Sequence, residues 1–290
     1  MVSSDFLPLI IFTLLVQWSV GVFSVITCFQ LIYLRKAEDR NTMFEFERTK
    51  QFLTIPIMAL ALIVSLFHLG DPIGAYRSIY NLFSSWLSRE VFFAVLLFGL
   101  LVAQVLLNRR IGRSHNHISI QIYNLFISFV GVCEIFIMSS IYFSTVNPMW
   151  SHFYTYVLFF GTTVIFGSVG ILLASQRVKD KNNNLFRNRN KVIMILITAI
   201  LIQLCLLPIY LNLLKGVSES GLIPYQLVKN KLFLQYLPRW CSALIISAIM
   251  YIYGHRQRLS PALLYVCTTI LIISEILGRI LFFETGIPTI

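Results

Sequence analysis

The sequence predicts an all-α protein, a single domain over residues 1–290 built as a polytopic bundle of eight transmembrane helices. Hydrophobic residues make up 57% of the chain and charged residues only 12%, whereas a soluble domain carries about 25% charged residues. The apolar residues gather in runs of about 20, the length that crosses a bilayer as a helix. These runs lack the ten-residue alternation of membrane β-strands, which excludes a barrel.

The eight expected spans are residues 7–34, 52–69, 88–107, 119–142, 153–175, 192–214, 235–254 and 262–283. The first run is too long for a signal-peptide core, has no basic residue before it and has no A-x-A cleavage site, so we expect a retained span. Pro56 and Pro208 fall inside the second and sixth runs, where neighbouring helices can satisfy the freed backbone groups.

The distribution of Lys and Arg predicts the orientation of the bundle. Sixteen of them lie in the loops 35–51, 108–118, 176–191 and 255–261, and six lie in the loops and span ends of the other face. Because cytoplasmic loops carry the excess of Lys and Arg, both termini are expected on the outer, periplasmic side. The net charge of +11 therefore reflects topology, and no basic domain for nucleic acid is present.

The loop between the second and third spans reads FHLGDPIGAYRSIYNLFSSWLSRE over residues 67–90. Apolar and aromatic residues recur in it at helical spacing, with polar residues between them. This pattern predicts a short amphipathic helix over about 72–87 in the outer interface. Pro72 suits its first turn and Asp71 its N-cap. A re-entrant loop with a purely structural role is the alternative.

Ionisable residues inside a bundle are costly and usually mark a site or a pathway. With the expected topology, all those within or at the edges of spans fall in the outer half, and the inner half has essentially none: His68, Glu90, Glu134, Arg239, Glu275 and Arg279. A proton channel needs groups at several depths. A one-sided cluster instead predicts a pocket for a lipid-borne molecule that exchanges protons with the outer medium, and His68 is the sharpest candidate because imidazole titrates near neutrality.

Each candidate has a structural alternative. Glu275 and Arg279 are spaced i,i+4 with the acid first, so they can simply neutralise one another. Glu134 can be a protonated structural carboxyl, and Arg89 and Glu90 can extend to the interface.

Redox centres are not expected within this chain. Of the five histidines only His68 is placed within a span, which disfavours a bis-histidine haem. The five cysteines are scattered over separate runs without the close pairs of a metal or cluster site. Walker A, Rossmann, nucleophile-elbow and HExxH motifs are absent from the sequence.

The stretch HLGDPIGAYRSIYNLFSSWLSRE, residues 68–90, resembles the HLG-x-P…A…LS-x-E block of the membrane-anchor subunits of dimethyl sulfoxide reductase, the DmsC family. The likeness continues in PLIIFTLLVQ at 8–17, RW at 239–240 and SEILGRILFF at 274–283. Asp71 departs from the pattern, because a small or polar residue is expected there.

The resemblance implies a haem-free and metal-free anchor in the bacterial inner membrane that serves anaerobic respiration. Anchors of this family oxidise menaquinol at an outer-side site and hold an iron–sulfur subunit and a molybdopterin catalytic subunit on the outer face. The family's quinol-site histidine and carboxylate fall on His68 and Glu90. Arg77, Arg239 and Arg279 are expected to orient a quinone oxygen, with Glu134 and Glu275 as further proton-transfer candidates. A multi-span transporter and a passive anchor without quinol chemistry remain the alternatives.

Overall fold

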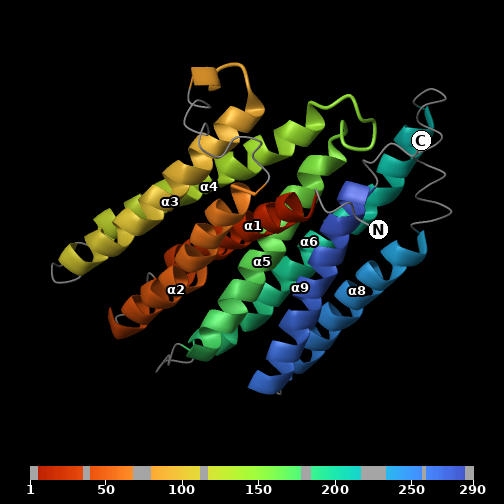
Figure 1. Ribbon diagram of the computed structural model, residues 1–290. Coiled ribbons are helices and arrows are strands. Elements are labelled where there is room, and N and C mark those ends of the chain that lie inside the picture. Colours follow the sequence, from red (N-terminus) through yellow and green to blue (C-terminus); the bar gives the residue numbers. More distant parts are fainter. Residues whose placement is uncertain are drawn as a thin grey trace.

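The computed structural model describes residues 6–34, 40–67, 80–111, 117–177, 184–216, 233–256 and 259–284. Within these ranges the regular structure is helical: α1 (Leu7–Phe29), its π-helical extension η2 (Gln30–Leu34), α2 (Arg40–Ser65), α3 (Trp86–Ile111), α4 (His117–Phe143), α5 (Tyr154–Arg177), α6 (Asn184–Gly216), α8 (Phe233–His255) and α9 (Pro261–Glu284) (Figure 1).

Eight of the described helices are long and apolar enough to cross a membrane, which confirms the predicted fold class and makes the chain a multi-pass membrane protein. Their apolar segments are Leu7–Ile32, Phe44–Ser65, Trp86–Asn108, Ile118–Phe143, Tyr154–Gln176, Asn188–Leu214, Tyr236–His255 and Pro261–Glu284. The largest departure from the predicted bounds is in α2. Its apolar segment begins at Phe44 rather than at residue 52, so part of the expected loop 35–51 is membrane helix.

Consecutive helices run in opposite directions, so the bundle has two distinct ends (Figure 1). The beginning of α1 meets the end of α9, where the ring centroids of Phe6 and Phe283 lie 5.9 Å apart. We call this the terminal end. It also holds the beginnings of α3, α5 and α8 and the ends of α2, α4 and α6. The other end, where α2 begins, is called the opposite end.

Helix α1 lies at the centre of the bundle and packs against α2, α4, α5 and α9. Glycine permits its close approach to α5, because a Cβ atom on Gly21 would overlap the carbonyl oxygen of Thr163. Small residues are the usual means by which membrane helices bring their backbones together.

Local sequence explains several helix beginnings. Pro8 occupies the first turn of α1, a position where the missing N–H is not needed. The Ser260 hydroxyl accepts the Leu263 N–H at 3.2 Å and caps α9. The Ser85 hydroxyl accepts the Ser88 N–H at 3.4 Å and caps α3 in the same way.

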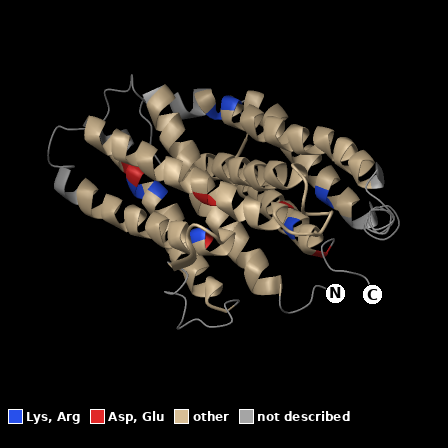
Figure 2. Ribbon diagram, turned by 90° about the horizontal axis from the view of Figure 1, so that it is seen from above, with Lys and Arg blue, Asp and Glu red and all other residues tan. Residues whose placement is uncertain are grey.

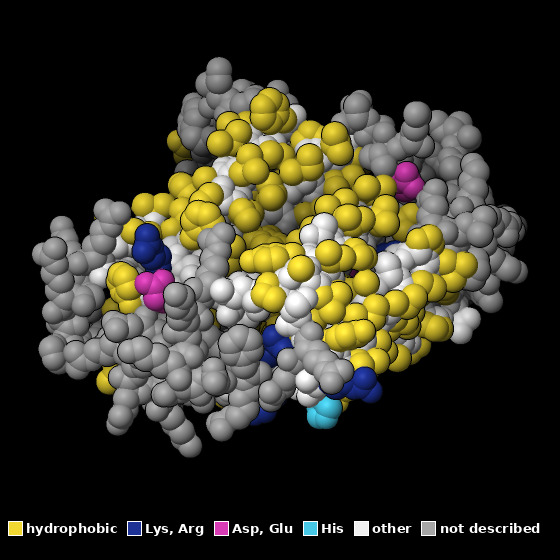
Figure 3. All heavy atoms as spheres, turned by 90° about the horizontal axis from the view of Figure 1, so that it is seen from below, with side chains coloured by type: hydrophobic (Ala, Val, Ile, Leu, Met, Phe, Trp, Pro, Cys, Tyr) yellow, Lys and Arg dark blue, Asp and Glu magenta, His cyan; other side chains and the backbone are white. Residues whose placement is uncertain are grey.

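The described part of the face seen in Figure 3 is largely apolar, as expected of a lipid-facing surface. Large side chains such as Phe52, Phe129 and Ile245 are exposed along the helices. Lys, Arg, Asp and Glu are few along the described helices (Figure 2).

The predicted interfacial helix over 72–87 is wrong in the part that the structure describes. Residues 80–81 form a single 3-10 turn, residues 82–84 form a turn, and α3 begins at Trp86. Residues 68–79, with Asp71 and Pro72, lie outside the described ranges.

Candidate functional site

Five of the seven predicted site residues lie in the described part of the chain, and all five are buried in the half of the bundle nearer the terminal end. They are Glu90 on α3, Glu134 on α4, Arg239 on α8, and Glu275 and Arg279 on α9. His68 and Arg77 lie outside the described residues.

Glu90 and Glu134 form a pair of buried carboxyl groups. Glu90 is 2% exposed and Glu134 is 0% exposed. Oε1 of Glu90 and both carboxyl oxygens of Glu134 are buried without a hydrogen-bond partner, and the two side chains interact electrostatically. A buried carboxyl oxygen that accepts no hydrogen bond carries a desolvation cost, and such unsatisfied groups are typical of a site that has another partner.

The neighbouring Arg89 is half-buried and bonds to the turn before α3. Its Nε donates to the carbonyl oxygen of Leu82 at 2.8 Å, and its Nη2 donates to that of Phe83 at 2.8 Å. The guanidinium also lies over the Trp86 ring, 4.3 Å from its centroid. Arg89 thus fixes the turn at 82–83 against the first turn of α3, and Glu90 points into the bundle.

Arg239, Glu275 and Arg279 form a second polar group, with different partners from those expected. Nη2 of Arg239 lies 3.9 Å from Oε2 of Glu275 and donates to Oε1 of Gln203 at 3.1 Å. The same Glu275 oxygen accepts the Thr162 hydroxyl at 2.6 Å.

Glu275 and Arg279 do not form the close ion pair that their i,i+4 spacing allows, although the two groups interact electrostatically. Nη2 of Arg279 donates to Oε1 of Gln17 at 2.7 Å, and its guanidinium lies 3.8 Å from the centroid of the Phe159 ring. Nε and Nη1 of Arg279 are buried without a partner. The Arg279 side chain therefore joins α9 to α1 rather than closing a bond within its own helix.

Tyr142 on α4 is buried near both groups and interacts electrostatically with Glu90 and with Arg279. Buried polar side chains from α3, α4, α8 and α9 therefore gather in the half of the bundle nearer the terminal end. This set, called the polar row below, comprises Glu134, Glu90, Tyr142, Arg279, Glu275 and Arg239. Sequence reasoning missed Tyr142, because a tyrosine in an apolar run looks like packing.

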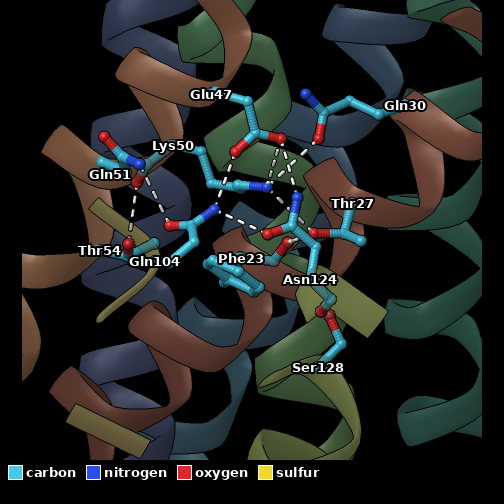
Figure 4. Close-up of polar contacts among 10 residues, drawn as sticks. All are labelled: Phe23, Thr27, Gln30, Glu47, Lys50, Gln51, Thr54, Gln104, Asn124 and Ser128. Carbon is cyan, nitrogen blue, oxygen red and sulfur yellow. Dashed lines mark hydrogen bonds and ion pairs between the residues drawn. The ribbon is translucent and has the colours of Figure 1, made fainter. Parts of the chain in front are cut away.

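A second buried network, also missed, lies at the opposite end. Nζ of Lys50 contacts Oε1 of Glu47 at 2.9 Å, and the Lys50 side chain is fully buried. The ammonium also donates to Oε1 of Gln30 at 3.3 Å and to Oγ1 of Thr27 at 3.4 Å (Figure 4). The expectation that the inner half holds essentially no ionisable group is therefore wrong.

Amide side chains from α3 and α4 complete the coordination of Glu47. Nδ2 of Asn124 donates to Oε1 at 2.9 Å, and Nε2 of Gln104 donates to Oε2 at 2.8 Å (Figure 4). Gln51 in turn donates to Oε1 of Gln104 at 3.3 Å. The carboxylate is thus satisfied from three helices, which makes this network a clamp between α1, α2, α3 and α4 and distinguishes it from the unsatisfied Glu90–Glu134 pair.

The described residues do not form a candidate metal site. Among the residues that the structure describes, His, Cys, Asp and Glu do not gather in groups of three that could hold a metal ion.

The sequence of this eight-span bundle matches a known protein family. A family model described as DMSO reductase anchor subunit (DmsC) matches residues 3–285. The chain belongs to this family. The resemblance drawn from the sequence is thereby confirmed, and the protein is a multi-pass member of a family of membrane anchors.

Two curated members of the DMSO reductase group are similar to this anchor-family protein. It is 27% identical over 166 residues to the C subunit of the anaerobic dimethyl sulfoxide reductase of Haemophilus influenzae, a match that covers 56% of this chain and 55% of the relative. It is 29% identical over 167 residues to the YnfH subunit of an anaerobic dimethyl sulfoxide reductase of Escherichia coli, over the same shares of each protein. The match thus spans about half the length of these curated relatives.

Proposed function

We propose that this chain is the quinol-oxidising membrane anchor of a DMSO reductase-type molybdoenzyme complex. It takes menaquinol from the bilayer and passes the electrons to an iron–sulfur subunit, from which they reach a molybdopterin catalytic subunit in anaerobic respiration. Family membership supports the anchor role. The observation that carries the quinol chemistry is Glu90, a buried carboxyl group with an unsatisfied oxygen beside a second carboxyl group.

The chemistry requires two proton acceptors. Oxidation of menaquinol to menaquinone releases two electrons and two protons, and a cationic oxidised quinol is unfavourable in a poorly hydrated site. His68, which directly follows Phe67 in the sequence, accepts one proton. Glu90 accepts the other and can share it with Glu134. Each acceptor must come within hydrogen-bond reach of a quinol hydroxyl, about 2.6–3.2 Å.

The basic residues have an orienting role in this proposal. Arg77 lies in the same loop sequence as His68, and Arg279 interacts with Tyr142, the neighbour of Glu90. A guanidinium N–H that donates to a quinone oxygen would fix the ring while the protons leave. Arg239 and Glu275 stand at the far end of the polar row from Glu90, so we assign them a supporting role at this site.

The excess of Lys and Arg in the loops of the opposite end supports an orientation with the terminal end on the periplasmic side of the inner membrane. Both termini, the quinol site and the partner subunits then share one face. Because protons and electrons leave on the same side, turnover is expected to move little net charge across the membrane.

The test is to purify the complex with His68→Ala or Glu90→Gln in this chain. We expect both complexes to assemble and to accept electrons from artificial donors, while menaquinol-driven reduction falls at least about 100-fold, the scale of general acid–base catalysis. Glu45→Gln is the matched control, because Glu45 is an exposed carboxylate on α2, and its turnover should equal that of the wild type.

Normal menaquinol turnover in the His68→Ala and Glu90→Gln complexes would reject this site, whereas a wild-type complex that menaquinol cannot reduce would indicate a passive anchor. Purification of the wild-type protein without an iron–sulfur or molybdopterin subunit would reject the complex itself and favour a transporter.

A further inference from the structure

A cavity of about 220 Å³ lies near the terminal end, between α5, α6, α8 and α9. None of its lining residues belongs to α1–α4, so it is separate from Glu90 and Glu134. An apolar cavity of about 150 Å³ already admits a benzene ring, and this one therefore has room for a ring with substituents.

The walls of the cavity are aromatic and aliphatic. Five aromatic side chains line it, namely Tyr154, Tyr210, Tyr236, Trp240 and Phe282. The rings of Tyr154 and Tyr210 stack with centroids 4.8 Å apart and an interplanar angle of 18°. Their hydroxyls are engaged, since Tyr154 donates to the carbonyl oxygen of Gln203 at 2.9 Å and Tyr210 to that of Met149 at 2.8 Å. Such walls favour a flat apolar molecule.

Two buried N–H groups among the lining residues have no acceptor. Trp240 is 8% exposed and its Nε1 has no hydrogen-bond partner, and Arg239 is 3% exposed and its Nε has none. Buried donors without acceptors are uncommon in folded proteins. Arg239 and Trp240 are neighbours on α8, and both line the cavity. A ligand with an acceptor oxygen would give these N–H groups a hydrogen-bond partner.

The charge balance indicates that this ligand is neutral. The one charged side chain among the lining residues is Arg239, and Glu275 lies 3.9 Å from its guanidinium. An anionic phosphate headgroup would therefore bring an uncompensated charge into an apolar cavity, which is expensive. A carbonyl oxygen on an aromatic ring meets both requirements, acceptor and flat apolar body.

We propose that this cavity binds a respiratory-type quinone by its ring, with a carbonyl oxygen accepting from Trp240 or Arg239. The site is distinct from the menaquinol site proposed at His68 and Glu90 and does not depend on it. Arg239, which lines the cavity, and Glu90 both belong to the polar row.

The experiment is photolabelling of the full-length protein in lipid nanodiscs with a diazirine-bearing menaquinone analogue, followed by mapping of labelled peptides. We expect label on the cavity-lining parts of α6 and α8, saturable and displaced by unlabelled menaquinone. Leu207→Trp, which fills the cavity, should lower this label at least about tenfold. Leu213→Trp on the same helix is the control, since Leu213 is 48% exposed, and its label should remain.

A second variant avoids doubts about folding. Trp240→Phe keeps an aromatic ring and removes the unpaired N–H, so the protein should fold with only a modest loss of stability from the smaller ring. Menaquinone should then compete about fivefold less well for the α8 label, as expected from one lost hydrogen bond. Equal competition in wild type and in both Trp240→Phe and Leu207→Trp would overturn the proposal.

The two proposals fail separately. Label on α6 and α8 that phospholipid displaces and menaquinone does not would overturn the quinone assignment, whatever the turnover. Label on these helices that persists in His68→Ala supports the second site, whereas normal turnover in His68→Ala rejects only the first.

Discussion

Substitution of Lys50 by methionine tests the buried network at the opposite end of the bundle. The change keeps an unbranched apolar side chain and deletes the ammonium that contacts Glu47 at 2.9 Å, Gln30 at 3.3 Å and Thr27 at 3.4 Å. Removal of one partner from a buried ion pair costs about 3–5 kcal/mol. Because Asn124 and Gln104 continue to donate to the Glu47 carboxylate, we expect the lower end, about 3 kcal/mol.

The loss corresponds to a more than 100-fold shift of the unfolding equilibrium. It can be measured by reversible unfolding of the purified protein in mixed micelles. Arg48→Met is the control, since Arg48 is exposed on the same turn of α2, and it should change stability by less than about 0.5 kcal/mol. The double variant Glu47→Gln, Lys50→Met removes both charges and should regain most of the loss. A Lys50→Met protein as stable as the Arg48→Met control would refute the reasoning.

Two further predictions concern α1 and the loop before α5. Gly21→Ala places a methyl group against the carbonyl oxygen of Thr163 and should destabilise the bundle by about 1–3 kcal/mol. Gly99→Ala is the control, because a Cβ atom at Gly99 has no other atom within 4 Å, and this variant should lose no stability in the same unfolding assay. Burial lowers the pKa of His152, and its Nδ1 accepts the Tyr154 N–H at 3.3 Å. The unfolded state therefore binds a proton at His152 more readily than the folded state does. The free energy of unfolding should be highest above about pH 6.5 and should fall as the pH drops below it. A His152→Gln protein that shows the same fall in thermal unfolding would contradict this.

The spans could be predicted from the sequence because each depends on a local property, a run of about 20 apolar residues. The largest boundary error arose where that property fails. Glu47, Lys50 and Gln51 make the first turns of the α2 span look like a loop, yet other helices satisfy these polar groups. Gln104 and Asn124 bond to Glu47 and Gln51, and Gln30 and Thr27 accept from Lys50. The sequence held one signal for that network, namely the amide side chains of Gln104 and Asn124 within two apolar runs.

The placement of the five described site residues at one end also followed from the sequence, since depth is set by the position along a span. Their partners did not follow. Arg279 bonds to Gln17 across 262 positions of the sequence, although Glu275 stands one turn away on the same helix. Packing at Gly21 and Gly278 helps to decide which faces of α1, α8 and α9 turn toward their neighbours. The spacing of residues along the sequence does not show this.

The central position of α1 has a consequence for biogenesis. This helix is translated before the other helices of the bundle, yet its neighbours include α5 and α9, which emerge much later. Gln17 finds its acceptor in Phe159 of α5 and its donor in Arg279 of α9. During synthesis α1 must therefore wait in the bilayer with an unmatched amide, and α9 must arrive with an unmatched guanidinium. A nascent polypeptide arrested on the ribosome before α9 should accordingly remain protease-sensitive and held by the insertion machinery, because α9 completes the contacts of the helix at the middle of the bundle.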